Sequence, residues 1–210
     1  MTKRARLCCG LLVLTLAWTA GSASATVILP QNLEQIESAA QRVFVAVCTS
    51  ATAQTDVRGI PITVYTFKVS QAVKGDLKDG GAVVVRQVGN NTPGPNGLVA
   101  RIVGAPSYKV GQEVMLFLNP PSRIGLTAPV GLSQGVFNIV TDPNGNRQIV
   151  LDPVRRRTLA AGVKPAKYAA TGKLSATEQT WLTDPPERTD VSAFCTLVRK
   201  ISEERKRTGK

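Results

Sequence analysis

The chain reads RVFVAVC at residues 42–48 and PITVYTFKV at residues 61–69, and these two stretches decide its fold. In the first, Val43, Val45 and Val47 share one face of an extended strand, because successive side chains of a strand point to opposite faces. In the second, aromatic and β-branched side chains occupy both faces. Residues of these types at a period of two predict β-strands that are buried on one or both sides.

The same pattern continues to residue 148, where short β-branched runs alternate with Gly, Pro and Asn. It predicts about seven strands in all. The last two flank Asp142-Pro143-Asn144-Gly145, whose Pro and Gly favour a tight turn, so we expect a terminal β-hairpin. The strands expected after the first two are 82–88, 98–103, 114–118, the weaker candidate 124–130, 135–141 and 147–151.

Helices are expected on either side of this β region. Leu33–Ala40 has the spacing of a short helix. Residues 153–187 are read as a linker or a loose wrap, because Leu159–Thr177 is rich in Ala, Gly, Lys and Thr and has few side chains to bury. Residues 188–210 are expected to hold an amphipathic helix, capped by Thr189 or Asp190, and a basic tail. Its apolar face carries Val191, Phe194, Cys195, Val198 and Ile201.

Residues 1–25 have the organisation of a secretory signal peptide. Three basic residues precede an apolar run at 11–18, and Ala23-Ser24-Ala25 supplies the small residues of a cleavage site. The apolar run is shorter than the ~20 residues that a membrane helix needs. We therefore expect export to the periplasm or the extracellular space, no membrane span, and a β-domain over residues 26–152.

The cysteines follow from this expectation. Cys8 and Cys9 lie in the leader and would be removed with it, which leaves Cys48 and Cys195. An even pair in an oxidising compartment predicts a disulfide between an early strand and the C-terminal helix. Closing so long a loop is worth about 4–5 kcal/mol in the chain-entropy model. The alternative is that both are buried free thiols.

The chain is basic, with 26 Lys and Arg against 14 Asp and Glu, and only three of the basic residues lie in the leader. Outside the cell this charge would attract anionic partners such as lipid headgroups, envelope polysaccharide or nucleic acid. The alternative is that the positive charge only keeps an exported protein soluble. The candidate polyanion contacts are two basic clusters: Arg155, Arg156, Arg157, Arg205, Lys206 and Arg207.

The chain has no histidine, which excludes Ser-His-Asp and Cys-His catalysis and His-ligated zinc. The segment GLSQG at 131–135 matches the nucleophile-elbow pattern, but a strand pattern follows it where the elbow needs a helix. No Ser-x-x-Lys occurs either. We therefore interpret residues 131–135 as a glycine-flanked turn between strands.

Carboxylate chemistry needs two facing acids, and few acids lie in the β region. Glu113 abuts a strong strand but has no evident partner acid, so it is interpreted as an exposed charge at the strand entry. Asp142 and Asn144 lack the further ligands of a calcium loop and are assigned to turn chemistry. Asn90-Asn91-Thr92 is a glycosylation sequon in an expected loop. No catalytic residue, cofactor or metal site is predicted.

Several motifs in the β region together resemble a known family. They are Val43–Val47, Tyr65–Val69 followed by Val73-Lys74-Gly75, Val83–Val85, Gly104 with Tyr108–Leu118, and Gly131–Phe137. Their order is similar to that of exported bacterial relatives of the netrin module, the fold of tissue inhibitors of metalloproteinases. The resemblance covers residues 42–141. It implies a mostly β fold, a small closed or partly open OB-like barrel, here with a short N-terminal helix and a C-terminal amphipathic helix.

The same resemblance marks a difference in mechanism. In the inhibitors, a mature N-terminal cysteine binds the zinc of the protease, whereas this chain is expected to begin at Thr26-Val27 and lacks Cys-x-Cys. The metal-chelating mechanism is therefore not implied. We expect an exported, non-enzymatic binding or scaffold module whose partner is an envelope protein or an anionic envelope component. The alternatives are a protease inhibitor-like module acting through the loop at 89–97, a polyanion binder and, less favoured, a carboxylate-based hydrolase.

Overall fold

A computed structural model of the protein describes residues 28–90, 99–169 and 174–207. The expected leader, Asn91 and Thr92 of the sequon and loop residues 91–97 lie outside this range. The elements are α2 (Leu33–Ala39), β1 (Arg42–Thr55), β2 (Pro61–Lys74), β3 (Ala82–Val88), β4 (Glu113–Leu118), the 3-10 helix η1 (Leu132–Gly135), β5 (Val136–Thr141), β6 (Arg147–Val150), α3 (Pro153–Ala160), α4 (Ala166–Ala169), α5 (Ala176–Thr183), β7 (Arg188–Asp190) and α6 (Val191–Arg207).

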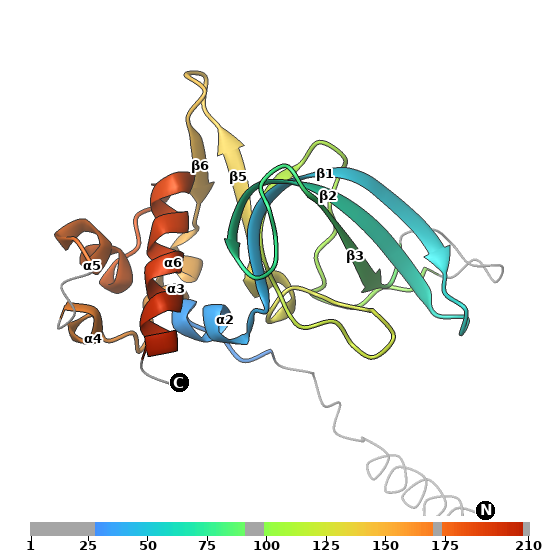
Figure 1. Ribbon diagram of the computed structural model, residues 1–210, viewed down its shortest axis with the longest axis horizontal. Helices are drawn as coiled ribbons and strands as arrows, with labels where there is room; N and C mark the ends of the chain where they lie inside the picture. Colours follow the sequence, from blue (N-terminus) through green and yellow to red (C-terminus); the bar gives the residue numbers. More distant parts are fainter. Residues whose placement is uncertain (1–27, 91–98, 170–173, 208–210) are drawn as a thin grey trace, which may run out of the picture.

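The strands form one antiparallel sheet in the order β3-β2-β1-β4-β5-β6-β7. The expectation of a mostly β fold with helices at its two ends is confirmed. β1, β2 and β3 curl together on one side of the molecule, and the helices gather on the other (Figure 1). Among the described residues, β3 and β7 form the two edges of the sheet and do not pair with each other, so the sheet is open.

The curl of the sheet has a local cause in the pairing of β1 with β2. Their register shifts at three points, between Val43 and Phe44, between Val45 and Ala46, and between Cys48 and Ser50. An extra residue in one strand bends it and increases its right-handed twist. The curl brings β3 near the loop that follows β4, where the Thr127 amide donates to the Arg86 carbonyl at 2.9 Å.

The sheet separates two hydrophobic clusters, because alternate residues of its strands face opposite sides. We call the first the helix-side core: it contains Val43 and Val45 of β1 and the apolar residues of α2, α3, α5 and α6. Its centre is a row of aromatic rings, Phe117, Phe137, Phe194 and Trp181, with neighbouring centroids 4.9–5.3 Å apart. The second, the strand core, contains Phe44, Ala46, Cys48, Tyr65, Phe67, Val69, Val83, Val85, Tyr108, Val114, Leu116 and Leu118.

Two local expectations are confirmed by their hydrogen bonds. β5 and β6 form the expected hairpin, and the Asp142 carboxylate accepts from the backbone amides of Asn144 and Asn146. α6 begins at Val191, as its apolar spacing predicts, and the Asp190 carboxylate caps it by accepting from the Ala193 amide at 2.9 Å. All five of its predicted apolar residues are buried.

Two expected strands are absent from the described residues. Residues 99–103 form no strand; their carbonyls accept two backbone hydrogen bonds, at Ala100 from the Asn90 amide and at Ile102 from the Ala105 amide. Residues 124–130 form only one isolated bridge, between Leu118 and Pro129. Pro120 and Pro121 before this segment and Pro129 within it explain the difference, because proline has no N–H to donate to a ladder. In contrast, β7 (Arg188–Asp190) was not predicted, because its three polar residues show no alternation of apolar and polar side chains.

The segment 153–187, expected as a linker or loose wrap, differs from that expectation where the structure describes it. It forms α3, α4 and α5, capped by Asp152 and Ser175. The reason is that five of its apolar and aromatic side chains face the helix-side core. The side chains buried there are Leu159, Tyr168, Leu174, Trp181 and Leu182. A few apolar residues are therefore enough to hold this segment against the rest of the protein.

The disulfide expected between Cys48 and Cys195 is not formed in the structure, where both thiols are free and buried. The sheet explains this, because Cys48 belongs to the strand core and Cys195 to the helix-side core on the opposite face. Burial raises the pKa of Cys48 and raises that of Cys195 to about 11.

We expect Cys48 and Cys195 to resist alkylation in the folded protein, because the thiolate is the reactive form and neither is exposed. Iodoacetamide at pH 8, followed by mass spectrometry of the peptides, should modify both residues only after unfolding. A disulfide-linked peptide pair containing the two residues in the unreduced protein would contradict the structure.

Candidate functional site

The basic cluster on α3 is largely committed to contacts within the protein. Arg155 lies over the Phe137 ring, 4.8 Å from its centroid, and donates to the Gln134 carbonyl. Its burial lowers its pKa to about 10. Arg156 donates to the Pro185 carbonyl and pairs with Asp184. These contacts attach α3 to the neighbouring segments rather than present cations to a ligand.

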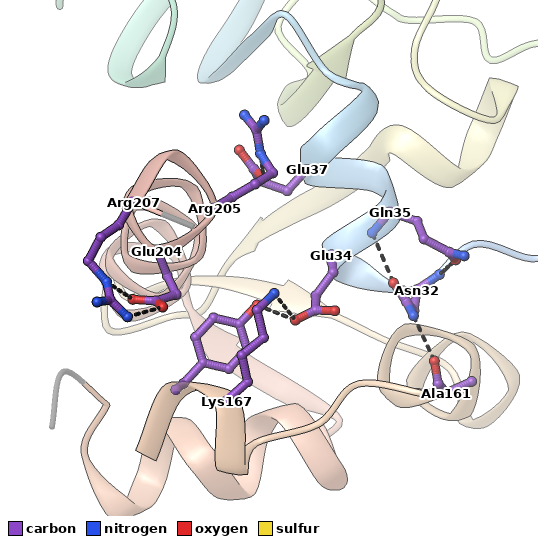
Figure 2. A network of polar contacts seen from close by, with 10 residues as sticks. Asn32, Glu34, Gln35, Glu37, Ala161, Lys167, Glu204, Arg205 and Arg207 are labelled. Carbon is purple, nitrogen blue, oxygen red and sulfur yellow. Dashed lines mark hydrogen bonds and ion pairs between the residues drawn. The ribbon is translucent and has the colours of Figure 1, made fainter. Parts of the chain in front are cut away.

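The cluster on α6 is used in a similar way. Arg205 pairs with Glu37, whose side chain is wholly buried, at 3.0 Å, and Arg207 makes two hydrogen bonds to Glu204 (Figure 2). Glu37 also pairs with Lys74 of β2 at 2.8 Å. One buried carboxylate thus links α2, β2 and α6. Of the six predicted polyanion contacts, only Arg157 and Lys206 are exposed and make no hydrogen bond or ion pair within the described residues.

Glu113 is paired rather than a lone charge at the strand entry. Arg147 of β6 donates to both of its carboxylate oxygens, at 2.5 and 3.0 Å, and also to the Ser70 hydroxyl at 3.2 Å. Such a two-pronged contact satisfies the carboxylate and fixes its orientation. The partner of Glu113 is therefore a cation, Arg147, and this contact links β4 to β6.

The segment 131–135 consists of a turn residue, Gly131, and the 3-10 helix η1, and the strand β5 follows it, as expected. Gly131 and Leu132, the first residue of η1, both have positive φ, +56° and +57°. A positive φ is strained for leucine. Ser133 is exposed. Asp142 likewise serves its turn, and hydrogen bonds from the Asn146 side chain and backbone lower the pKa of its carboxyl.

A pocket that the sequence did not predict lies where β2 and β3 meet the loop at 101–107. Its volume is about 370 Å³, and its walls include Thr63 and Tyr65 of β2, Gln87 of β3 and Arg101 and Val103 of the loop. The walls are held by local bonds: the Thr63 hydroxyl donates to the Gly89 carbonyl and the Gly89 amide to the Pro61 carbonyl, both at 2.8 Å.

The unusual group in this pocket, which we call the Gln87 pocket, is a buried carboxamide. Gln87 is 5% exposed, and its Nε2 donates to the Pro106 carbonyl at 2.6 Å. Because a carbonyl can only accept, this contact fixes which end of the amide is nitrogen. The other end, Oε1, is buried and has no hydrogen-bond partner in the described chain. Leaving such an acceptor unpaired costs about 1–3 kcal/mol.

The rim of the Gln87 pocket is apolar and projects into solvent. Val103 is 94% exposed, and its neighbour Ile102 is 44% exposed. A single exposed apolar side chain is ordinary, but here two line the same pocket as Gln87, whose Oε1 is unpaired in the described chain. The combination suits a ligand group that is apolar at its sides and carries an N–H or O–H at its tip.

One sequence signal could have indicated this pocket. In β3, Val83, Val85 and Gln87 occupy alternate, inward-facing positions, so a polar residue stands where the pattern asks for an apolar one. By contrast, the aromatic side chains of Tyr65, Phe67, Tyr108, Phe117 and Phe137 are all buried. Tyr65 serves both purposes, because it also lines the pocket.

Two kinds of feature are absent from the described residues. They contain no helix long and apolar enough to cross a membrane. They also contain no group of three or more Cys, Asp or Glu side chains arranged to hold a metal ion. In comparisons with known proteins, no family model, no curated protein and no solved structure matches the chain.

Proposed function

We propose that the protein is an exported, non-enzymatic binding module, and that its partner protein inserts a polar-tipped side chain into the Gln87 pocket. The observation that carries the proposal is the buried Oε1 of Gln87, which has no partner in the described residues. Buried polar groups in folded proteins nearly always have a hydrogen-bond partner, so this acceptor is a position where a ligand N–H or O–H would gain a bond. The apolar rim at Ile102 and Val103 would cover the sides of the inserted group.

The proposed fold family is consistent with this function. The curl of β1–β3 and the bond from Thr127 to Arg86 support an OB-like arrangement of the netrin-module type, in which a loop rather than a strand completes the ring. Polyanion binding through the six predicted basic residues has less support, because four of them are engaged with other parts of the protein.

The proposal predicts a preference for tyrosine over phenylalanine, because the two differ only by the O–H that would reach Gln87. We expect N-acetyl-tyrosine amide to bind roughly fivefold more tightly than N-acetyl-phenylalanine amide, the usual worth of one neutral hydrogen bond. An NMR titration that follows the Gln87 side-chain amide and the Val103 backbone amide measures both affinities.

Two variants make this test specific. Gln87→Leu removes the acceptor and should abolish the preference. Gln71→Leu is the matched control, because it makes the same change on β2 outside the lining of the pocket, and it should retain the preference. No shift at Gln87 with either compound, or an unchanged preference in Gln87→Leu, would refute the proposal.

A further inference from the structure

A second pocket, separate from the Gln87 pocket, lies between the end of β2 and α6. Its volume is about 340 Å³. Lys74 lines it from β2, and Arg199, Ser202, Glu203 and Lys206 line it from α6. Three cations therefore face one acid across this pocket, which we call the Lys206 pocket.

Two of these cations are fixed in place by other contacts. Arg199 donates one N–H to the Ala72 carbonyl at 2.7 Å, and a guanidinium has further N–H groups to offer. Lys74 donates to the Glu37 backbone carbonyl at 2.6 Å, and its Nζ lies 2.8 Å from the Glu37 carboxylate, so the ammonium group is held in place from α2. A ligand would meet donors that are already oriented, so little ordering would oppose its binding.

The local charge remains positive after the internal pairs are counted. The Glu37 carboxylate is shared by Lys74 and Arg205, so one carboxylate serves two cations. Lys206 is exposed and has no ion pair among the described residues. Glu203 is the single acid in the lining. The pocket is therefore suited to an anion that carries more than one negative charge.

A buried hydroxyl completes the set of donors. Ser202 is 6% exposed and lines the pocket, and its side chain makes no hydrogen bond to any part of the chain that the structure describes. Together with Lys74, Arg199 and Lys206 it offers four donors from two elements. A carboxylate presents two oxygens, whereas a phosphate group presents three or four, which matches the larger number of donors.

We propose that the Lys206 pocket binds a phosphate group, either free or as part of a phosphoester. Arg199, Lys74 and Lys206 supply the positive charge, and the Ser202 hydroxyl donates to one phosphate oxygen. Only Lys206 belongs to the basic clusters that the sequence indicated. The other members come together because β2 and α6 pack against each other.

The test is an NMR or calorimetric titration of the full chain with inorganic phosphate at low ionic strength, where an exposed site is least screened. Lys206→Gln should weaken binding about fivefold, in line with the loss of one exposed charge contact. Arg157→Gln is the matched control, because it removes the same charge from an exposed, unpaired residue on α3, and it should leave binding unchanged. Ser202→Ala should weaken binding without altering the net charge.

Other outcomes would decide against the site. Equal losses in Lys206→Gln and Arg157→Gln would mean a diffuse attraction to the whole protein, and unchanged binding in both Lys206→Gln and Ser202→Ala would also overturn the proposal. A second arm identifies the source of the phosphate. If vesicles containing phosphatidic acid sediment the wild type but not Lys206→Gln, the source is a lipid headgroup, whereas phosphate binding without sedimentation identifies a soluble ligand.

Discussion

Replacing Glu37 with glutamine is expected to lower the free energy of unfolding by about 3–5 kcal/mol, the usual cost of breaking a buried ion pair by removing one partner. The carboxylate is wholly buried, and both Lys74 and Arg205 depend on it. Lys74 is itself mostly buried, so the substitution leaves a cation in a poorly solvated place without its counter-charge. Glutamine keeps the size of the side chain, so the loss reports charge rather than packing.

Urea denaturation of the wild type and the variant measures this difference. Asp76→Asn is the matched control, because it also neutralises a carboxylate that pairs with an arginine, here Arg42 at 2.9 Å, but on the surface. An exposed pair of this kind contributes little to stability, because water and salt screen it. Equal effects in the two variants would show that the burial of Glu37 has no energetic importance.

The second large effect is expected at the centre of the helix-side core. Phe194→Ala should cost about 3–5 kcal/mol, because it removes a fully buried ring and leaves a cavity between two others. The Phe194 ring lies 5.2 Å from that of Phe137 on β5 and 4.9 Å from that of Trp181 on α5. The variant therefore tests whether the C-terminal helices share one core with the sheet.

Thermal and urea unfolding, followed by far-UV circular dichroism and by Trp181 fluorescence, should both shift, and the two probes should give the same midpoint. Phe194→Leu should lose less than Phe194→Ala, since it retains most of the apolar volume. Val154→Ala, at an exposed position on α3, should change stability little. Separate transitions for the two probes would indicate that residues 153–207 unfold independently of the sheet.

The sequence was most informative where a pattern was strong and local. The Asp142–Gly145 turn and the apolar face of α6 each depend on residues close together in the chain, and both are confirmed. The length of β1 and β2 was underestimated, because residues 49–55 are small and polar and have no apolar alternation. They are strand residues because they pair with residues 61–66, a long-range contact that propensity does not contain.

The candidate sites were harder to foresee for the same reason. Gln87 reaches the Pro106 carbonyl across 19 positions, and Arg199 reaches the Ala72 carbonyl across 127. The charges along the sequence pointed to runs of adjacent basic residues. In the folded protein, most of these residues make hydrogen bonds or ion pairs with other parts of the chain. The donors of the Lys206 pocket are spread over two elements, so their juxtaposition exists only after β2 and α6 have packed together.

The packing of α6 also has a consequence for the order of folding. It is the last element of the described chain, yet it contacts α2, the first, as well as β2, β6 and β7. A chain is synthesised from its N-terminus, so the cover of one face of the sheet stays incomplete until residues 191–207 have been made. The β1–β2 and β2–β3 hairpins can pair early, because their partners are close in sequence. We expect the helix-side core to form last, once residues 191–207 have been made, and a chain that lacks them to be retained by chaperones that bind exposed apolar strands.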